Sequence, residues 1–155
     1  MFQRLPGSGA GITGGYDKAM AEVRQRDPIR RAGGVANLGV FGGPEAVKTV
    51  KGFAQDEAEA VRVAAQFALA LLGQAEALPK MIEYLTHEKH EYRKRAVVAL
   101  TSVAGADIAA DHESVESCAA AKKAYEAWWK KSGSGLVWDE RKKVFTAGGA
   151  GKAKK

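Results

Sequence analysis

Apolar residues recur at steps of three and four along most of the chain. The clearest case is the stretch 61–72, where Val61, Ala65, Ala68 and Leu72 fall on one face of a helix. A second apolar stripe follows Gly73, over residues 78–85. No segment shows the sustained two-residue alternation that a half-buried sheet requires. The pattern therefore predicts an all-α fold.

This helical pattern repeats. Segments starting at residues 29, 61 and 92 each open with an apolar residue and an arginine, and these arginines are Arg30, Arg62 and Arg93. Their spacings are 32 and 31 residues, and small residues follow at matching positions. Periods in this range are typical of helical-pair solenoids. We therefore expect a short α-solenoid (superhelix) of antiparallel helix pairs, with about six or seven helices.

Residues that start and stop helices agree with this division. Asp27 followed by Pro28 is typical of an N-cap and a first helical position. Gly73 is placed to end the helix of the second repeat, and Pro79 lies in the first turn of the next helix. Thr86 is the cap expected ahead of the third repeat.

Four regions follow from these signals. Residues 1–15 are Gly-rich and are expected to form a flexible arm. The helical repeat domain is expected over residues 16–131, with a first helix from Tyr16 to Arg26. Residues 132–145 are predicted to be an extended segment packed on the last repeat, and 146–155 a disordered basic tail.

The net charge of +6 is concentrated at one end of the chain. Residues 1–121 hold 14 Lys/Arg and 15 Asp/Glu, whereas residues 122–155 hold 10 and 3. A basic end on a neutral body favours an acidic partner or nucleic acid, and a solubilising tail is the alternative. The single cysteine and the lack of a long apolar run or a secretory h-region favour a cytoplasmic protein without a membrane span.

The arginine-led repeats resemble bacterial HEAT repeats of the type first described in phycobilisome lyases. The stretch Tyr125-Glu-Ala-Trp128-Trp129, followed by Leu136-Val-Trp138-Asp-Glu-Arg141, resembles an ending common in such proteins. The resemblance covers about residues 27–145 and implies fold rather than function, since the family contains scaffolds, adaptors and only occasional enzymes. Gly33 and Gly34 depart from it, because they replace the usual alanines.

Trp128, Trp129 and Trp138 have two possible roles. They can seal the open end of the last repeat, which no further repeat covers. Alternatively, an exposed tryptophan beside lysines suits a partner's groove or a stacked base. The candidate partner-binding residues form an aromatic and basic set, comprising Trp128, Trp129, Lys130, Lys131, Trp138, Arg141, Lys142 and Lys143.

Arg30, Arg62 and Arg93 also have two interpretations. They can bridge adjacent repeats by pairing with loop carboxylates, or form a basic ladder along one edge. Acidic residues close in sequence, including Asp56 and Glu57, favour bridging.

Motifs for catalysis or cofactor binding are incomplete. The glycines of residues 9–14 match a dinucleotide-binding spacing but have no preceding strand. His87 and His90 are three residues apart rather than four, so a zincin site fails, and a site joining them with His112 and Cys118 is disfavoured against ordinary loop residues. Cys118 lies on an apolar stripe without a base and is expected to be a buried, inert thiol. We therefore expect no metal, no cofactor and no enzymatic activity.

The sequence thus predicts a non-catalytic protein–protein interaction module or a structural subunit of a larger assembly. Its partner would be another protein or complex. The alternative is a nucleic-acid-associated protein that binds through the basic C-terminal region.

Overall fold

The computed structural model describes residues 8–147, with side chains from residue 15 onward. These residues fall into two compact units, which meet in sequence between Ala68 and Leu69 and are described separately. The described residues are mostly helical, with seven α-helices and one short pair of strands, so the predicted all-α repeat class is confirmed.

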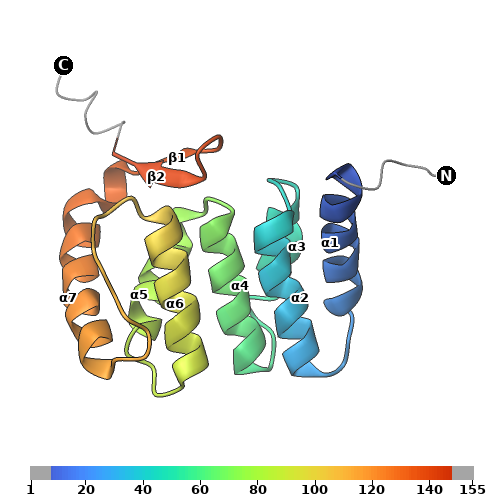
Figure 1. The fold of residues 1–155 in the computed structure, drawn as a ribbon, viewed down its shortest axis with the longest axis horizontal. Coiled ribbons are helices and arrows are strands. Elements are labelled where there is room, and N and C mark those ends of the chain that lie inside the picture. The colour runs from blue at the N-terminus through green and yellow to red at the C-terminus, as the bar shows by residue number, and fades with distance from the viewer. Residues whose placement is uncertain (1–7, 148–155) are drawn as a thin grey trace. The chain divides into compact units, whose positions relative to one another are not determined.

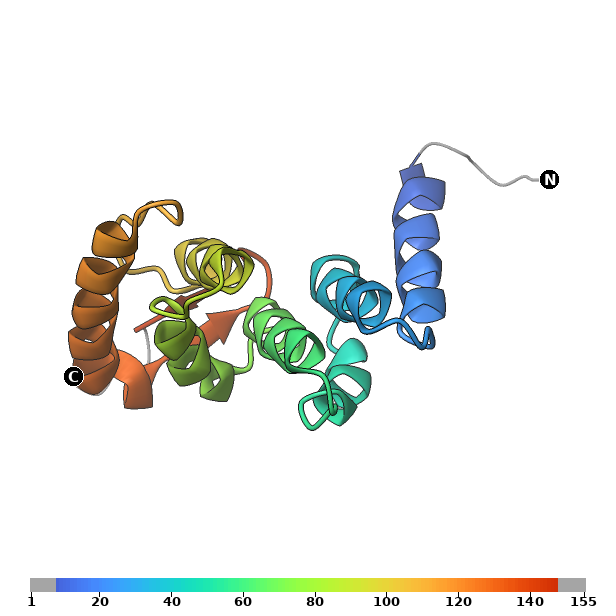
Figure 2. The same cartoon turned by 90° about the horizontal axis from the view of Figure 1, so that it is seen from below.

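The first unit contains α1 (Ser8–Glu22), α2 (Pro28–Phe41), α3 (Ala46–Gly52) and most of α4 (Glu59–Leu71). Helix α2 packs against both α1 and α3 (Figure 1 and Figure 2). The predicted start of α2 is confirmed, because the Asp27 side chain accepts a hydrogen bond of 3.0 Å from the Ile29 amide and Pro28 follows it. The core of this unit consists of small and branched side chains, including Val23, Val35, Leu38, Val50, Val61 and Ala64.

Helix α1 begins earlier than the sequence pattern indicated. It starts at Ser8 rather than at Tyr16, so it includes half of the expected N-terminal arm. Glycine lowers helix propensity, so Gly15 counted against a helix in the sequence pattern. In the structure, a Cβ at Gly15 would lie only 3.0 Å from the Phe41 ring of α2, so the glycine allows α1 and α2 to pack closely. The rest of the expected arm, residues 1–7, lies outside the described residues, as does most of the expected tail at 148–155.

The second unit contains the end of α4, the 3₁₀ turn η1 (Ala75–Ala77), α5 (Leu78–Tyr84), α6 (His90–Val103) and α7 (Val115–Ser132). Helix α5 packs against both α6 and α7. The core is formed by larger side chains, including Leu78, Met81, Leu85, Leu100, Val103 and Tyr125. As predicted, Gly73 ends α4 with a positive φ of 87°, and Pro79 lies in the first turn of α5.

Thr86 does not cap the third repeat, contrary to the prediction. Helix α6 begins at His90, and its N-cap residue, Lys89, makes no side-chain cap bond. The Thr86 hydroxyl instead accepts a hydrogen bond of 3.2 Å from Lys122 of α7. Other contacts described below stabilise the loop before α6, so this helix start does not need a hydroxyl cap.

The predicted extended segment is a β-hairpin. After the 3₁₀ turn η2 (Gly133–Gly135), β1 (Val137–Asp139) pairs antiparallel with β2 (Val144–Thr146), with Trp138 opposite Phe145. The turn is closed by the Asp139 carboxylate, which accepts the amides of Arg141 and Lys142, and by Lys143 with a φ of 57°. Strands of three residues are too short to produce a recognisable alternation.

Because helices approach closely in the first unit, we expect alanine substitutions at two glycines of α2 to change stability in opposite directions. A Cβ at Gly39 would lie 2.6 Å from the Cα of Ala68 in α4, whereas a Cβ at Gly33 would meet nothing within 4 Å. We expect Gly39→Ala to lower the free energy of unfolding by about 1–3 kcal/mol, because backbones must separate. The matched variant Gly33→Ala should raise it by up to about 1 kcal/mol through helix propensity.

Urea unfolding followed by circular dichroism measures both effects. If Gly39→Ala proved as stable as Gly33→Ala, the close contact between α2 and α4 would be wrong.

Candidate functional site

The loops that precede α2, α4 and α6 are each held by one arginine in the same way. The Nη1 atom of Arg31 donates to the carbonyl oxygens of Gln25 and Arg26, at 3.0 and 2.8 Å. Arg62 donates to the carbonyls five and six residues before it, at 3.0 and 2.8 Å, and Arg93 does the same at 3.1 and 3.0 Å. We call this interaction the arginine–loop clamp.

The first repeat aligns with the other two on Arg31, one residue later than the sequence pattern predicted. Arg31, and not Arg30, makes the contacts that Arg62 and Arg93 make, so the clamps recur at 31 residues in both steps. Arg30 is largely exposed and pairs with Glu22 at 3.2 Å. The arginines bind mainly to backbone carbonyl oxygens of the loops, whereas the sequence pattern predicted pairing with loop carboxylates.

A carboxylate does take part in the first clamp. Both oxygens of Asp56, in the loop before α4, accept hydrogen bonds of 2.9 Å from Arg31. Asp56 Oδ1 also accepts the Ala58 amide at 2.9 Å. The hydrogen bond from the Arg31 guanidinium lowers the pKa of Asp56 below its ordinary value. This bidentate pair therefore joins α2 directly to the loop that follows α3.

Trp138 is partly exposed and packs against Gly73, the residue that ends α4. A Cβ at Gly73 would lie 2.5 Å from its indole, and its ring packs edge-on against Phe145 with centroids 4.8 Å apart. Gly105, which follows α6 with a φ of 71°, is equally close to the hairpin, since a Cβ there would lie 2.6 Å from the Phe145 carbonyl oxygen. These contacts bring the hairpin against the residues that follow α4 and α6.

Trp128 and Trp129 are both partly exposed, and they face different surroundings. Trp128 packs edge-on against the buried ring of Tyr125, with centroids 6.0 Å apart. Trp129 lies against Gly133, where a Cβ would be 2.7 Å from its ring. The two indoles also contact each other, with ring centroids 6.3 Å apart at a tilt of 52°, and Trp129 lines a surface cavity.

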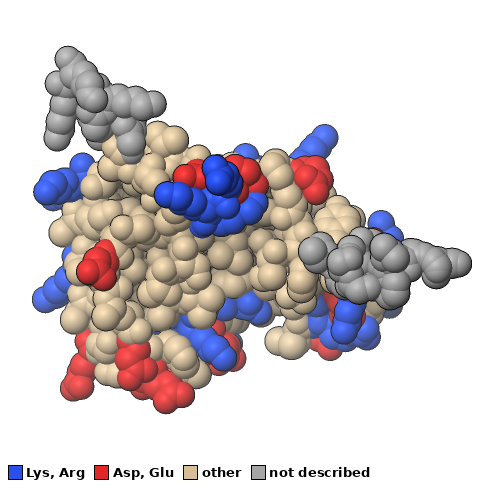
Figure 3. Space-filling view, turned by 45° about the horizontal axis from the view of Figure 1, so that its top comes forward, with Lys and Arg blue, Asp and Glu red and all other residues tan. Residues whose placement is uncertain are grey.

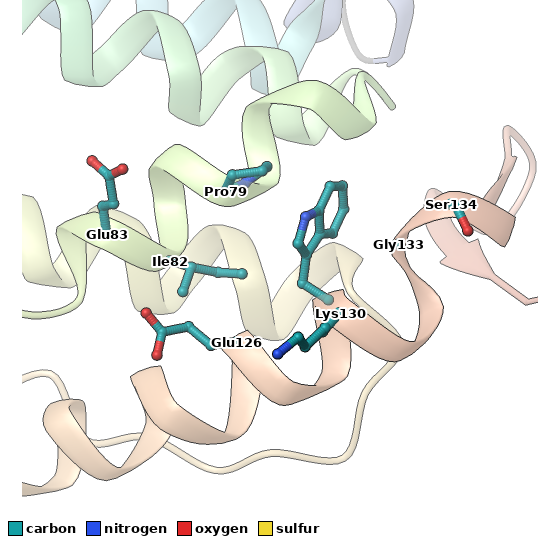
Figure 4. Close-up of a pocket in the computed structure, with 8 residues that line it drawn as sticks. Pro79, Ile82, Glu83, Glu126, Lys130, Gly133 and Ser134 are labelled. Carbon is teal, nitrogen blue, oxygen red and sulfur yellow. The ribbon is translucent and has the colours of Figure 1, made fainter.

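This cavity is a groove between α5 and α7. It has a volume of about 740 Å³ and is lined by Pro79, Ile82, Glu83, Glu126, Trp129, Lys130, Gly133 and Ser134. We call it the α5–α7 groove. Pro79 and Ile82 lie on the α5 side, while Glu126 and Lys130 project from α7 (Figure 4). The groove thus has an apolar floor and charged rims, which suits an apolar side chain flanked by polar groups.

Trp129 and Lys130 were predicted from the sequence as partner-binding residues, whereas the other residues of the groove were not. Its α5 side, Pro79 and Ile82, gave only helix-start and core signals. Helices α5 and α7 meet because an irregular segment after α6 replaces a regular second helix, and no local pattern predicts that path.

The basic residues of the hairpin are mixed with acidic ones. Lys143 is paired with Glu140, whose pKa this hydrogen bond lowers, and Glu140 also accepts the Trp138 Nε1–H at 2.8 Å. Basic and acidic side chains gather together on this part of the surface (Figure 3). The hairpin therefore lacks the uniformly basic face that a phosphate backbone favours, although Arg141 and Lys142 are exposed.

Cys118 is fully buried in α7. Its thiol donates to the Asp111 carbonyl at 3.4 Å, and burial raises the pKa of the thiol above its ordinary value. A thiol that is both inaccessible and protonated is a poor nucleophile.

Comparison with known proteins places the repeats in a family. A family model described as HEAT repeats matches residues 17–101, which is more than half of the chain. No curated protein and no solved structure matches the chain. Among the described residues, no helix combines the length and the hydropathy that a membrane crossing needs.

The Arg31–Asp56 pair predicts a pH dependence of stability. Because the pKa of Asp56 is lowered on folding, the pair adds to the free energy of unfolding at pH values above the ordinary pKa of about 3.8. This stabilisation is lost as the pH falls through the pKa of the folded state. Urea unfolding at pH 7, 5, 4 and 3 should show that Asp56→Asn loses less stability on acidification than the unchanged chain. Asp17→Asn, at an exposed carboxylate of α1, is the control. If the free energy of unfolding decreased with pH equally in the unchanged chain and in Asp56→Asn, the stabilising ion pair would be contradicted.

The burial of Cys118 predicts slow reaction with a disulfide reagent. We expect the native thiol to react at least about tenfold more slowly than the thiol of the chain unfolded in guanidinium. Moving the cysteine to an exposed position of α7, with Cys118→Ala and Ala120→Cys together, should abolish this protection. Equal rates for the native and unfolded chains would show that Cys118 is accessible.

Proposed function

The chain belongs to the HEAT-repeat family, and on this premise we propose that it is a non-catalytic protein-interaction module that binds its partner through the α5–α7 groove. HEAT repeats are commonly interaction or scaffold modules and are generally non-catalytic. The observation that carries the proposal is a groove that combines an apolar floor with a partly exposed tryptophan.

The groove has the composition of a docking site. Tryptophan is the residue type most enriched among those that dominate binding energies, particularly where neighbouring contacts exclude water. Trp129 has such a setting, with Pro79 and Ile82 opposite it across the groove. A partner segment that places one apolar side chain into this groove would cover the partly exposed surfaces of Trp129 and Pro79, next to the already buried Ile82.

The charged rim indicates which segments fit. Glu83 and Glu126 carry negative charge at the groove, against one positive charge at Lys130. An apolar residue next to a basic one is therefore the partner sequence that the groove favours. Charges of this kind contribute to specificity and association rate more than to affinity.

The other predicted residues have weaker support as binding groups. Trp138 contacts Gly73 and Phe145, so its contacts favour sealing over binding. The exposed Lys131, Arg141 and Lys142 remain candidates for a secondary contact with an acidic partner. Nucleic-acid association has no observation in its favour among the described residues, because the hairpin carries carboxylates among its basic groups.

Two finer parts of the proposal rest on the sequence alone. These are the resemblance to bacterial repeats of the phycobilisome-lyase type, with the aromatic-x-x-Trp-Trp ending, and the cytoplasmic location. The packing of Trp128 on Tyr125 supports a structural role for part of that ending.

Affinity capture with two matched variants tests the groove. The chain is immobilised and partners are captured from a lysate of its source at moderate salt, then identified by mass spectrometry. Glu126→Lys changes the groove at an exposed position, and Glu116→Lys makes the same change elsewhere on α7. We expect one defined protein to be captured by the unchanged chain and by Glu116→Lys, and the captured amount to fall at least about tenfold with Glu126→Lys.

Other outcomes would contradict the proposal. Capture that both variants retain equally would place the interface elsewhere. Retention that depends on nucleic acid, disappears at moderate salt and is lost when Arg141, Lys142 and Lys143 are neutralised would favour the alternative function.

A further inference from the structure

Three potential metal ligands converge beside the first turn of α6. His90 is the first residue of that helix, and His112 and Glu113 lie in the segment that leads into α7. One ligand atom from each lies within 4.8 Å of the other two. We call these three residues the His90 cluster.

The two imidazoles are close enough to share a metal ion in place of the proton that they share here. The Nε2 atom of His90 and the Nδ1 atom of His112 are hydrogen-bonded at 2.9 Å. Two histidines bound to one ion, with metal–nitrogen bonds of about 2.0–2.1 Å, hold their nitrogens about 2.9–3.4 Å apart, depending on the coordination angle. The exposed carboxylate of Glu113, which lies within 4.8 Å of both nitrogens, can move closer to supply a third ligand of opposite charge to the ion.

Hydrogen bonds fix the backbone that carries His112 and Glu113. Asp111 Oδ1 accepts the Glu113 amide at 3.0 Å, and Ser117 Oγ accepts the Asp111 amide at 2.9 Å. The thiol of Cys118 donates to the Asp111 carbonyl. The two ligands are thus held by α7, and His90 by α6, which favours a preformed site.

We propose that the His90 cluster binds a divalent transition-metal ion of the Zn²⁺ class. Two imidazoles and one carboxylate suit Zn²⁺, Ni²⁺ or Cu²⁺, whereas Mg²⁺ and Ca²⁺ require oxygen ligands. His90 and Glu113 are exposed, so an ion can enter from solvent. Bound there, the ion ties the irregular segment after α6 back to the first turn of that helix and leaves a coordination position open for water or a partner's side chain.

The sequence pattern predicted no metal site, because it pointed to other combinations of histidine and cysteine residues. His87 is not a member of the cluster: its Nδ1 accepts the Lys89 amide at 3.0 Å and its ring packs edge-on against Tyr92. Cys118, also considered there, is buried and donates to the Asp111 carbonyl. The third place in the cluster is taken by Glu113.

Isothermal titration calorimetry of the full chain without an affinity tag, with ZnCl₂ at pH 7.5, tests the site. We expect one ion per chain, and His90→Gln and His112→Gln should each weaken binding at least about tenfold. His87→Gln is the matched control and should leave the affinity unchanged, and MgCl₂ should produce no binding.

A second measurement guards against variants that fold poorly. Zn²⁺ should raise the thermal midpoint of the unchanged chain and of His87→Gln, but not that of His90→Gln or His112→Gln, whose circular dichroism should match the unchanged chain. The proposal is overturned if the unchanged chain binds no Zn²⁺ at one per chain, or if folded His90→Gln and His112→Gln bind it as tightly.

Discussion

The joints between consecutive repeats depend on one interaction, the arginine–loop clamp. A loop that turns the chain into a new helix leaves carbonyl oxygens that no helix satisfies, and a guanidinium can donate to two of them at once. Arg31, Arg62 and Arg93 do this with nearly the same distances. Because the donors come from the first turns of helices, each clamp fixes where the following helix begins, and the helices begin at intervals of 31 residues.

Local chemistry made much of this fold predictable. The cap of Asp27 and the helix end at Gly73 depend only on neighbouring residues, and both were identified from the sequence. The register of the first repeat was misassigned because Arg30 and Arg31 are adjacent and either continues the pattern. Only the contacts distinguish them, since Arg31 reaches the loop carbonyls and Asp56 while Arg30 pairs with Glu22.

The proposed docking groove and metal site were less accessible from the sequence, because each joins segments that are far apart in the chain. Trp129 was identified as a candidate, but its position opposite Ile82 depends on the path of the segment after α6. The same path brings His112 to His90. The extended segment at 132–145 was predicted, but its pairing into a hairpin was not, because the strands are short and the position of the hairpin against Gly73 and Gly105 needs the tertiary structure. A departure from the regular repeat thus produced both the groove and the histidine cluster.

The clamp is tested most directly by comparing Arg30→Met with Arg31→Met in equilibrium urea unfolding at neutral pH. Both variants remove one guanidinium from adjacent positions of α2 and retain an apolar stem, so they differ mainly in which contacts are lost. The account predicts a clearly lower unfolding midpoint for Arg31→Met and a midpoint close to that of the unchanged chain for Arg30→Met. Equal midpoints for the two variants, or a larger loss with Arg30→Met, would contradict it.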